Sequence, residues 1–437
     1  MRRLIEGQLE AWRIRRRRKP LLVRGARQVG KTFSVTRFGE TSFDNLVVVN
    51  LERDRALHAV FQPDLDPTRI VKELELSLNK RIRAGSTLLF LDEIQGCPKA
   101  LAALKYFREE VPELHVAAAG SLLEFALGSE SFPVGQVNIL EMYPMTFAEF
   151  LWAGGADESS AFVQKGPTTT SQAVHESLLT RLRDYLMVGG MPEAVSAFAD
   201  NHSIAEAREV HSELVETYRQ DFAKYAPRSD KGCLDDVLYA VARSVGSQIK
   251  YSRLSSRFSQ PTARKAFELL CTARLTWRVS HASPAGLPLV APESAKVFKA
   301  VLVDVGILHT LCGMPLATFP GTSDLLSVYR GAIAEQFVGQ EMLAAQGTLN
   351  YWSRRARGSS AEVDYLVALD GQVYPVEVKS GKAGKLKSMQ LCLEEYPNCP
   401  RGLVLSLAPW HELPKHRLVF VPLYHAYTAA SGQLKLR

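Results

Sequence analysis

The segment LLVRGARQVGKTF, residues 21–33, constrains the fold of this chain more than any other segment. Three apolar residues are followed within two positions by Gly25, and four residues then separate Gly25 from Gly30, Lys31 and Thr32. This spacing fits a turn in which successive backbone N–H groups point inward at an anion. Packing alone explains the leucines and not the glycines. We therefore expect a buried strand, a phosphate-cradling loop and a helix, in that order.

Each residue type in such a loop has a physical task. Glycine lets the backbone approach a ligand closely, and the helix that follows turns its positive N-terminal end toward the phosphates. Lys31 would reach the β- and γ-phosphates, and the hydroxyl of Thr32 would hold Mg2+. The predicted ligand-binding residues are Gly25, Ala26, Arg27, Gln28, Val29, Gly30, Lys31 and Thr32.

A second segment, TLLFLDEIQ, is an apolar strand that ends in Asp92 and Glu93. Carboxylates belong at the carboxyl edge of such a sheet, where Asp92 would support the Mg2+ shell and Glu93 would polarise the water that attacks the γ-phosphate. The alternative is two surface acids after a core strand. A third strand, LHVAAAGS, ends in Ser121, which would sense the γ-phosphate or serve as an ordinary turn or cap residue.

Composition narrows the class of protein. The chain has 437 residues, of which 46% are hydrophobic and 23% charged, and this suits a soluble globular protein of several domains. No apolar stretch approaches the roughly 20 residues of a membrane helix. The six cysteines show no paired metal spacing, so we expect a reduced, cytoplasmic setting and no membrane partner. The net charge is +7, and the run RIRRRRKP would attract nucleic-acid phosphates or simply be solvated surface.

Four regions follow from the patterning. Residues 1–152 alternate short apolar runs with amphipathic ones, which is typical of an α/β parallel sheet. A linker and helices follow over 153–226, then shorter helices and strands over 227–322, and finally a helix and alternating strands over 323–437. In the second region, VGGMPE indicates a plain turn between helices. In the third, a helix-turn-helix pattern carries Arg264 and Lys265, which would contact DNA phosphates or dock a protein.

The last region carries an independent signal in AEVDYLVALDGQVYPVEVKSG, a predicted hairpin. Asp364 lies on its first strand, and Glu377 and Lys379 share a face of the second. Acids so placed hold Mg2+ or Mn2+, which activates water, while the lysine positions the nucleophile or offsets charge. Glu335 on the preceding helix would be a third acid. The alternative is an exposed strand face with alternating charges.

These motifs together resemble a family of predicted AAA+-superfamily ATPases of bacteria and archaea. The resemblance covers nearly the whole chain and rests on RGARQVGKT, FLDEIQ, AAGSLLEFAL, YPMTFAEFL, YLMVGGMPEAV, AIAEQFVGQEM, YW, EVDYLV and VEVKSG. It implies an α/β P-loop NTPase core over 1–152 with a helical lid over 153–226, binding ATP. It also implies a winged-helix-like domain over 227–322 and a tail over 323–437 similar to PD-(D/E)XK nucleases, whose acids and lysine map onto Asp364, Glu377 and Lys379, with a helical acid at Glu335.

Two positions depart from the family pattern. Gln136 stands where members often have an arginine after glycine, so that an arginine able to contact the γ-phosphate is missing there. Val363 stands where the name of the nuclease motif places proline, which does no metal chemistry.

Two hypotheses about function follow. In the first, an ATPase controls a metal-dependent nuclease tail that acts on nucleic acid, DNA before RNA. In the second, the chain is a nucleotide-dependent switch or scaffold whose tail binds DNA or a protein partner, or a second copy of the chain, without cutting. Both hypotheses share the ATP and Mg2+ site.

Overall fold

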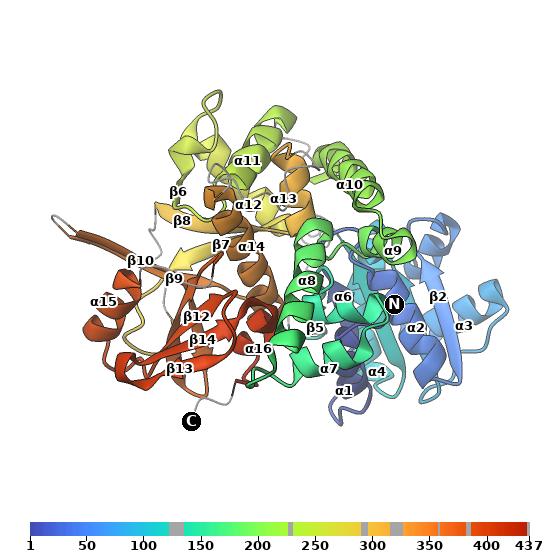
Figure 1. Cartoon of the computed structure of the whole chain (residues 1–437). Coiled ribbons are helices and arrows are strands. Elements are labelled where there is room, and N and C mark those ends of the chain that lie inside the picture. Colours follow the sequence, from blue (N-terminus) through green and yellow to red (C-terminus); the bar gives the residue numbers. More distant parts are fainter. Residues whose placement is uncertain are drawn as a thin grey trace. The chain divides into compact units, whose positions relative to one another are not determined.

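The computed structural model describes residues 1–121, 135–225, 230–289, 296–314, 327–356, 359–381 and 386–434. The chain forms two compact units, Met1–Tyr143 and Pro144–Arg437 (Figure 1). The expected boundary at 152 falls within the helix over Phe147–Ala153, which is part of the second unit. The expected boundaries at 226 and 322 lie outside the described residues, so the four-part division stays a prediction.

In the first unit, strands alternate with helices along the chain. Its described elements are α1 (Ile5–Arg13), β1 (Leu21–Arg24), α2 (Lys31–Ser42), β2 (Asn45–Asn50), η1 (Arg55–Phe61), α3 (Pro67–Leu78), β3 (Thr87–Asp92), η2 (Ile94–Gly96), α4 (Pro98–Glu110), β4 (His115–Gly120) and β5 (Asn138–Glu141). The strands expected from the four apolar runs are confirmed as β1 to β4. The short strand β5 was not anticipated, because it is only half-buried and carries no apolar run.

The five strands form one parallel sheet in the order β2-β3-β4-β1-β5. Successive side chains of a strand point to opposite faces, so each buried strand feeds two cores. Leu22 and Leu89 belong to the core that Phe107 of α4 completes. Leu88 points the other way, where Gly39 of α2 packs so closely that an added Cβ would lie 3.1 Å from the leucine side chain. The expected α/β parallel sheet covered on both faces is therefore confirmed.

The second unit begins with helices and continues into a mixed sheet. Its described elements are α6 (Phe147–Ala153), α7 (Asp157–Gln164), α8 (Gln172–Val188), α9 (Pro192–Asn201), α10 (Ile204–Tyr225), α11 (Lys231–Arg243), β6 (Ile249–Lys250), η3 (Tyr251–Arg253), α12 (Gln260–Thr272), β7 (Thr276–His281), β8 (Val297–Leu302), α13 (Val305–Leu311), α14 (Ser327–Gln346), β9 (Asn350–Ala356), β10 (Ser359–Leu369), β11 (Gln372–Val378), α15 (Lys387–Glu395), β12 (Gly402–Ser406), β13 (His411–Leu413), η6 (Pro414–His416), β14 (Leu418–Pro422), η7 (Leu423–His425) and α16 (Ala426–Ala430). Within the described ranges, no helix is both long and apolar enough to cross a bilayer.

Elements α11 to β8 follow one another in the order of a winged helix. Strand β8 pairs antiparallel with both β6 and β7. The first half of the expected helix-turn-helix differs, because only the short η3 forms there. The Ser255 hydroxyl accepts from the backbone N–H groups of Arg257 and Phe258 at 3.1 and 3.3 Å, which turns the chain before α12 begins.

The C-terminal strands and the winged-helix strands form one nine-stranded sheet, in the order β13-β14-β12-β11-β10-β9-β7-β8-β6. The two parts join where β7 pairs in parallel with β9, with Ser280 opposite Asn350. The predicted hairpin is confirmed as β10 and β11, with Leu369 opposite Gln372 across a turn in which Asp370 and Gly371 have φ of 48° and 77°.

The VGGMPE segment makes a tight junction inside the second unit. The backbone N–H of Gly190 donates to Asp304 Oδ2 at 2.6 Å, and the Gly190 carbonyl accepts from the Met145 N–H at 2.6 Å. A Cβ added at Gly190 would lie 2.1 Å from the Met145 carbonyl oxygen. Asp304 is fully buried, and its other oxygen accepts from the Gly306 N–H at the start of α13. Gly190 is therefore needed for close backbone contact, and the lid role stays a prediction.

We expect Gly190→Ala to destabilise the second unit by about 1–3 kcal/mol, the usual cost of forcing extra atoms into a packed site. Thermal unfolding would measure it as a lower midpoint. Gly286→Ala is the matched control, because an added Cβ there meets nothing within 4 Å. Equal midpoints for Gly190→Ala and wild type would contradict the close contact.

Candidate functional site

The predicted phosphate loop lies between β1 and α2, which begins at Lys31. Gly30 has φ 90° and ψ 23°, a left-handed backbone conformation that residues other than glycine rarely adopt. Gly25 passes so close to β5 that an added Cβ would lie 2.1 Å from the Met142 carbonyl oxygen. The loop therefore has the strand, turn and helix context that the spacing predicts, and the turn depends on both glycines.

The side chain of Lys31 is folded onto this loop. Its ammonium group donates to the carbonyl oxygens of Gly25 and Ala26, at 3.1 and 2.7 Å. Burial lowers the pKa of Lys31 to about 8, although the nearby carboxylates of Glu93 and Asp92 act in the opposite direction. A buried cation held by two neutral carbonyls is under-compensated, so an anion that enters the loop would gain from it.

Thr32 and Asp92 meet at the carboxyl end of β3. The Thr32 hydroxyl lies 3.0 and 3.1 Å from the two oxygens of Asp92, to which it donates. Burial raises the pKa of Asp92, and Glu93 adds to the rise. Hydroxyl and carboxylate oxygens are the ligands that Mg2+ prefers, so these two residues fit that ion.

Asn50 is a member of this site that the sequence reasoning missed. Its side-chain amide donates to Asp92 Oδ2 at 3.3 Å from the end of the neighbouring strand β2. The register places Asn50 directly beside Asp92. The signal in the sequence was the polar residue that ends LVVVN, at the same sheet edge as the acids.

Glu93 follows β3 in a left-handed conformation, with φ 49° and ψ 46°. Its carboxylate accepts from the Gln95 side-chain amide at 2.5 Å.

Ser121, just after β4, is buried, and its hydroxyl has no hydrogen-bond partner in the part of the chain that the structure describes. At Gln136, the side-chain oxygen accepts a hydrogen bond from the guanidinium of Arg108.

The residues predicted at the C-terminal site come together where β10, β11 and α14 meet. Asp364 on β10 accepts from the Val378 N–H at 2.8 Å, which places its carboxylate against β11 between Glu377 and Lys379. Lys379 donates to Glu377 Oε1 at 2.6 Å. Burial raises the pKa of Glu377 to about 7, and Asp364 adds to the rise. Burial also raises the pKa of Glu335, to about 8.

Two further members of this cluster were not anticipated. Lys299 on β8 is only 2% exposed, and its ammonium group donates to Glu362 Oε1 at 2.8 Å and to Asp364 Oδ1 at 3.4 Å. It also pairs with Glu335. Burial lowers the pKa of Lys299, yet the three carboxylates outweigh it and raise that pKa well above its ordinary value. We refer to Lys299, Glu335, Glu362, Asp364, Glu377 and Lys379 as the lysine-carboxylate cluster.

The cluster does not fit a divalent metal ion as it stands. Asp364 uses one oxygen for Lys299 and the other for a backbone N–H, and Glu377 uses one oxygen for Lys379. Across the described ranges, no group of three or more His, Cys, Asp or Glu side chains is arranged to hold a metal. The sequence signal that found the acids could not find Lys299, which lies in an apolar strand far away along the chain.

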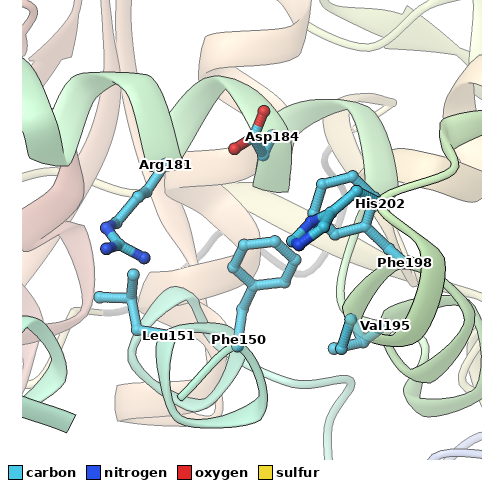
Figure 2. Close-up of a pocket in the computed structure, with 9 residues that line it drawn as sticks. Phe150, Leu151, Arg181, Asp184, Val195, Phe198 and His202 are labelled. Carbon is cyan, nitrogen blue, oxygen red and sulfur yellow. The ribbon is translucent and has the colours of Figure 1, made fainter. Parts of the chain in front are cut away.

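The helical part of the second unit contains a small pocket (Figure 2). The ring of Phe150 stacks on Phe198 with centroids 5.9 Å apart, and Arg181 and Asp184 reach the pocket from α8. Its volume of about 80 Å3 is far below that of ordinary ligand clefts.

On α12, Arg264 and Lys265 are exposed, and Arg264 is paired with Glu268 at 2.8 Å.

Three family models match separate parts of the chain. Residues 17–151 match a model described as an AAA domain, and residues 179–318 and 330–424 match two domains of unknown function, DUF8612 and DUF4143. No curated protein matches the chain. The first match agrees with the strand order and the glycine loop. Residues 17–151 have the fold of an AAA-type P-loop domain, a fold that binds nucleotides.

Several solved structures are similar to parts of this chain. The Walker-type ATPase PABY2304 of Pyrococcus abyssi is 15% identical over 70% of this chain and 94% of its own, with a TM-score of 0.45. Aeropyrum pernix Orc1, solved in complex with DNA, is 15% identical over 72% and 94%, with a TM-score of 0.29. The Thermotoga maritima RuvB branch migration motor is 16% identical over 67% and 90%, with a TM-score of 0.28. At these scores, the likeness carries no argument about what this chain binds.

Proposed function

We propose that the first unit binds ATP with Mg2+ and hydrolyses it. The observation that carries the proposal is the meeting of the glycine loop, the buried ammonium of Lys31 and the Thr32–Asp92 contact at one edge of the sheet. An AAA-type match over residues 17–151 supports it. Backbone N–H groups of the loop would donate hydrogen bonds to the phosphate oxygens, and the start of α2 adds the positive end of its dipole.

Lys31 would exchange partners when the nucleotide binds. Its ammonium group now donates to two loop carbonyls, and phosphate oxygens carry far more negative charge than carbonyls do. Thr32 and Asp92 would hold the Mg2+ with their hydroxyl and carboxylate oxygens, and the ion would supply positive charge to offset that of the phosphates. Ser121, whose hydroxyl has no hydrogen-bond partner among the described residues, would donate to the γ-phosphate.

Glu93 would take a proton from the attacking water. Its carboxylate is held by the Gln95 amide, so the acid is oriented before substrate arrives. The Gln136 position supplies no arginine, and an arginine from elsewhere would be needed to stabilise charge on the γ-phosphate in the transition state.

We expect Lys31→Ala to abolish ATP binding, because the phosphates lose the one ammonium group that lies in the loop. Isothermal calorimetry with pure protein would measure this. Lys72→Ala is the control, because Lys72 is an exposed residue on α3. The ATP proposal is wrong if wild type shows no heat of binding at millimolar ATP, or if both variants bind equally.

We expect Glu93→Gln to keep ATP binding and to slow turnover by about 10² to 10⁴-fold, the usual contribution of a positioned base. Phosphate release at saturating ATP would measure the rate. Glu110→Gln serves as the matched control, since Glu110 is exposed at the end of α4. A Glu93→Gln rate equal to wild type would remove Glu93 from the mechanism.

For the second unit, we propose nucleotide-dependent binding of DNA without cutting. Support comes from the winged-helix order and from the exposed Arg264 and Lys265 on α12, which would face DNA phosphates. The alternative, metal-dependent cutting by Asp364, Glu377 and Lys379, requires metal at a cluster whose oxygens are engaged by lysines and backbone.

Fluorescence anisotropy of labelled DNA, with and without ATP, tests this second part. We expect binding that weakens in the double variant Arg264→Ala and Lys265→Ala, and that falls as salt rises, because the contacts are to phosphates. Incubating the same DNA with Mg2+ or Mn2+ tests cutting. If wild type nicks the DNA and Asp364→Ala does not, the nuclease alternative is established. If wild type binds no DNA, DNA is refuted as the ligand, and the ATP proposal is unaffected.

A further inference from the structure

Lys299 is the most unusual charged residue in the second unit. It lies on β8 between Phe298 and Ala300, both of which are buried, and it is itself 2% exposed. A lysine withdrawn from water in this way needs oxygen partners. Lys299 has three, which come from Glu335 on α14 and from Glu362 and Asp364 on β10.

We propose that Lys299 is the resident cation of the lysine-carboxylate cluster. Its ammonium group takes the place of a divalent metal ion, so that the cluster binds no metal in the native protein. Neutralising Lys299 would expose a binding site for a hard divalent cation. This inference deepens the non-cutting part of the proposed function and is independent of the ATP site.

The surroundings of Lys299 hold its ammonium group in place. The rings of Tyr351 and Tyr365 lie 5.9 and 6.0 Å from Nζ, and the Tyr365 hydroxyl donates to the backbone carbonyl of Glu335 at 2.9 Å. The Gln248 amide donates to the second oxygen of Glu362 at 2.7 Å. The Glu362 carboxylate and the backbone of Glu335 are therefore held by other groups, while the Lys299 side chain, only 2% exposed, is enclosed by its partners.

The distribution of oxygen atoms explains why metal is excluded. A divalent ion needs several carboxylate oxygens at once, and it would lie beside the positive charge of Lys299, which repels it. One oxygen remains unused, because Glu377 Oε2 is buried and has no hydrogen-bond partner among the described residues. Without the Lys299 charge, Glu335, Glu362 and Asp364 would each have one oxygen released, and a hard divalent cation could take the place of the ammonium group among these three oxygens.

The position of Lys299 also connects two parts of the sheet. Lys299 lies on β8 of the winged-helix strands, whereas its partners lie on α14 and β10 of the C-terminal part. A metal ion at the cluster could not form this connection, because it has no covalent link to β8. The resident lysine therefore combines charge neutralisation with a cross-link between the two parts.

Titration of the full-length, nucleotide-free protein with Mn2+, followed by electron paramagnetic resonance, tests the proposal. We expect no stoichiometric site at the cluster in wild type. Lys299→Met keeps the length of the side chain without its charge, and we expect it to bind Mn2+ at least about tenfold more tightly than wild type. Lys299→Met with Asp364→Asn should lose that site. Mn2+ should raise the thermal midpoint of Lys299→Met and not that of wild type.

Controls separate the possible outcomes. Asp92→Asn removes the candidate metal ligand of the first unit, so that any site left in that variant belongs elsewhere. Wild-type binding of Mn2+ that Asp364→Asn or Glu335→Gln abolishes would overturn the proposal, as would a folded Lys299→Met that binds none. If Lys299→Met does not fold, the proposal is tested by titrating wild type and Lys299→Arg with Mn2+. Arginine keeps the positive charge, so neither protein should bind Mn2+ at the cluster, and binding by either one would overturn the proposal.

Discussion

A lysine ammonium group that is withdrawn from water must have oxygen partners close by, and this requirement shapes both units. In the first unit, the Lys31 ammonium group donates to two backbone carbonyls of the loop, and burial lowers its pKa to about 8 although Glu93 and Asp92 act in the opposite direction. In the second unit, Lys299 is surrounded by three carboxylates, which raise its pKa. The first ammonium group would gain from an incoming anion, whereas the second already has its anions. The need of a buried ammonium group for oxygen partners thus gives a loop at Lys31 that suits an anionic ligand. At Lys299 the same need is already met by carboxylates of the protein.

The parallel sheet of the first unit explains why its chemistry gathers at one edge. Each of its strands runs in the same direction, so the residues that follow β1, β2, β3 and β4 emerge together. Asn50 and Asp92 are therefore in contact, and Ser121 lies at the same edge of the sheet, although all three are far apart along the chain. Two helical layers keep the strands buried, and the polar residues are confined to the ends.

Much of the first unit could be predicted because its signals are local. The glycine spacing, the apolar runs and the acids after TLLFLDEIQ each need only a short window of sequence, and they correctly placed β1 to β4 and the loop. The strand β5 escaped prediction because this short edge strand is only half-buried and carries no apolar run. The expected helix before α12 was replaced by η3, because Ser255 offers its backbone neighbours a competing hydrogen bond.

Local patterns were enough to predict the P-loop unit, the hairpin and the positions of Asp364 and Glu377 on its strands, since strand periodicity and turn residues act over a few neighbouring positions; Lys379 lies one residue beyond the end of β11. What the two acids face depends on the tertiary fold. Lys299 reaches them through the pairing of β7 with β9, a long-range contact that no local pattern encodes. Likewise, the Gly190 contact with Asp304 joins residues more than a hundred positions apart. Local hydrogen bonding and periodicity are written in short windows, whereas the partner of a buried charge depends on the whole fold.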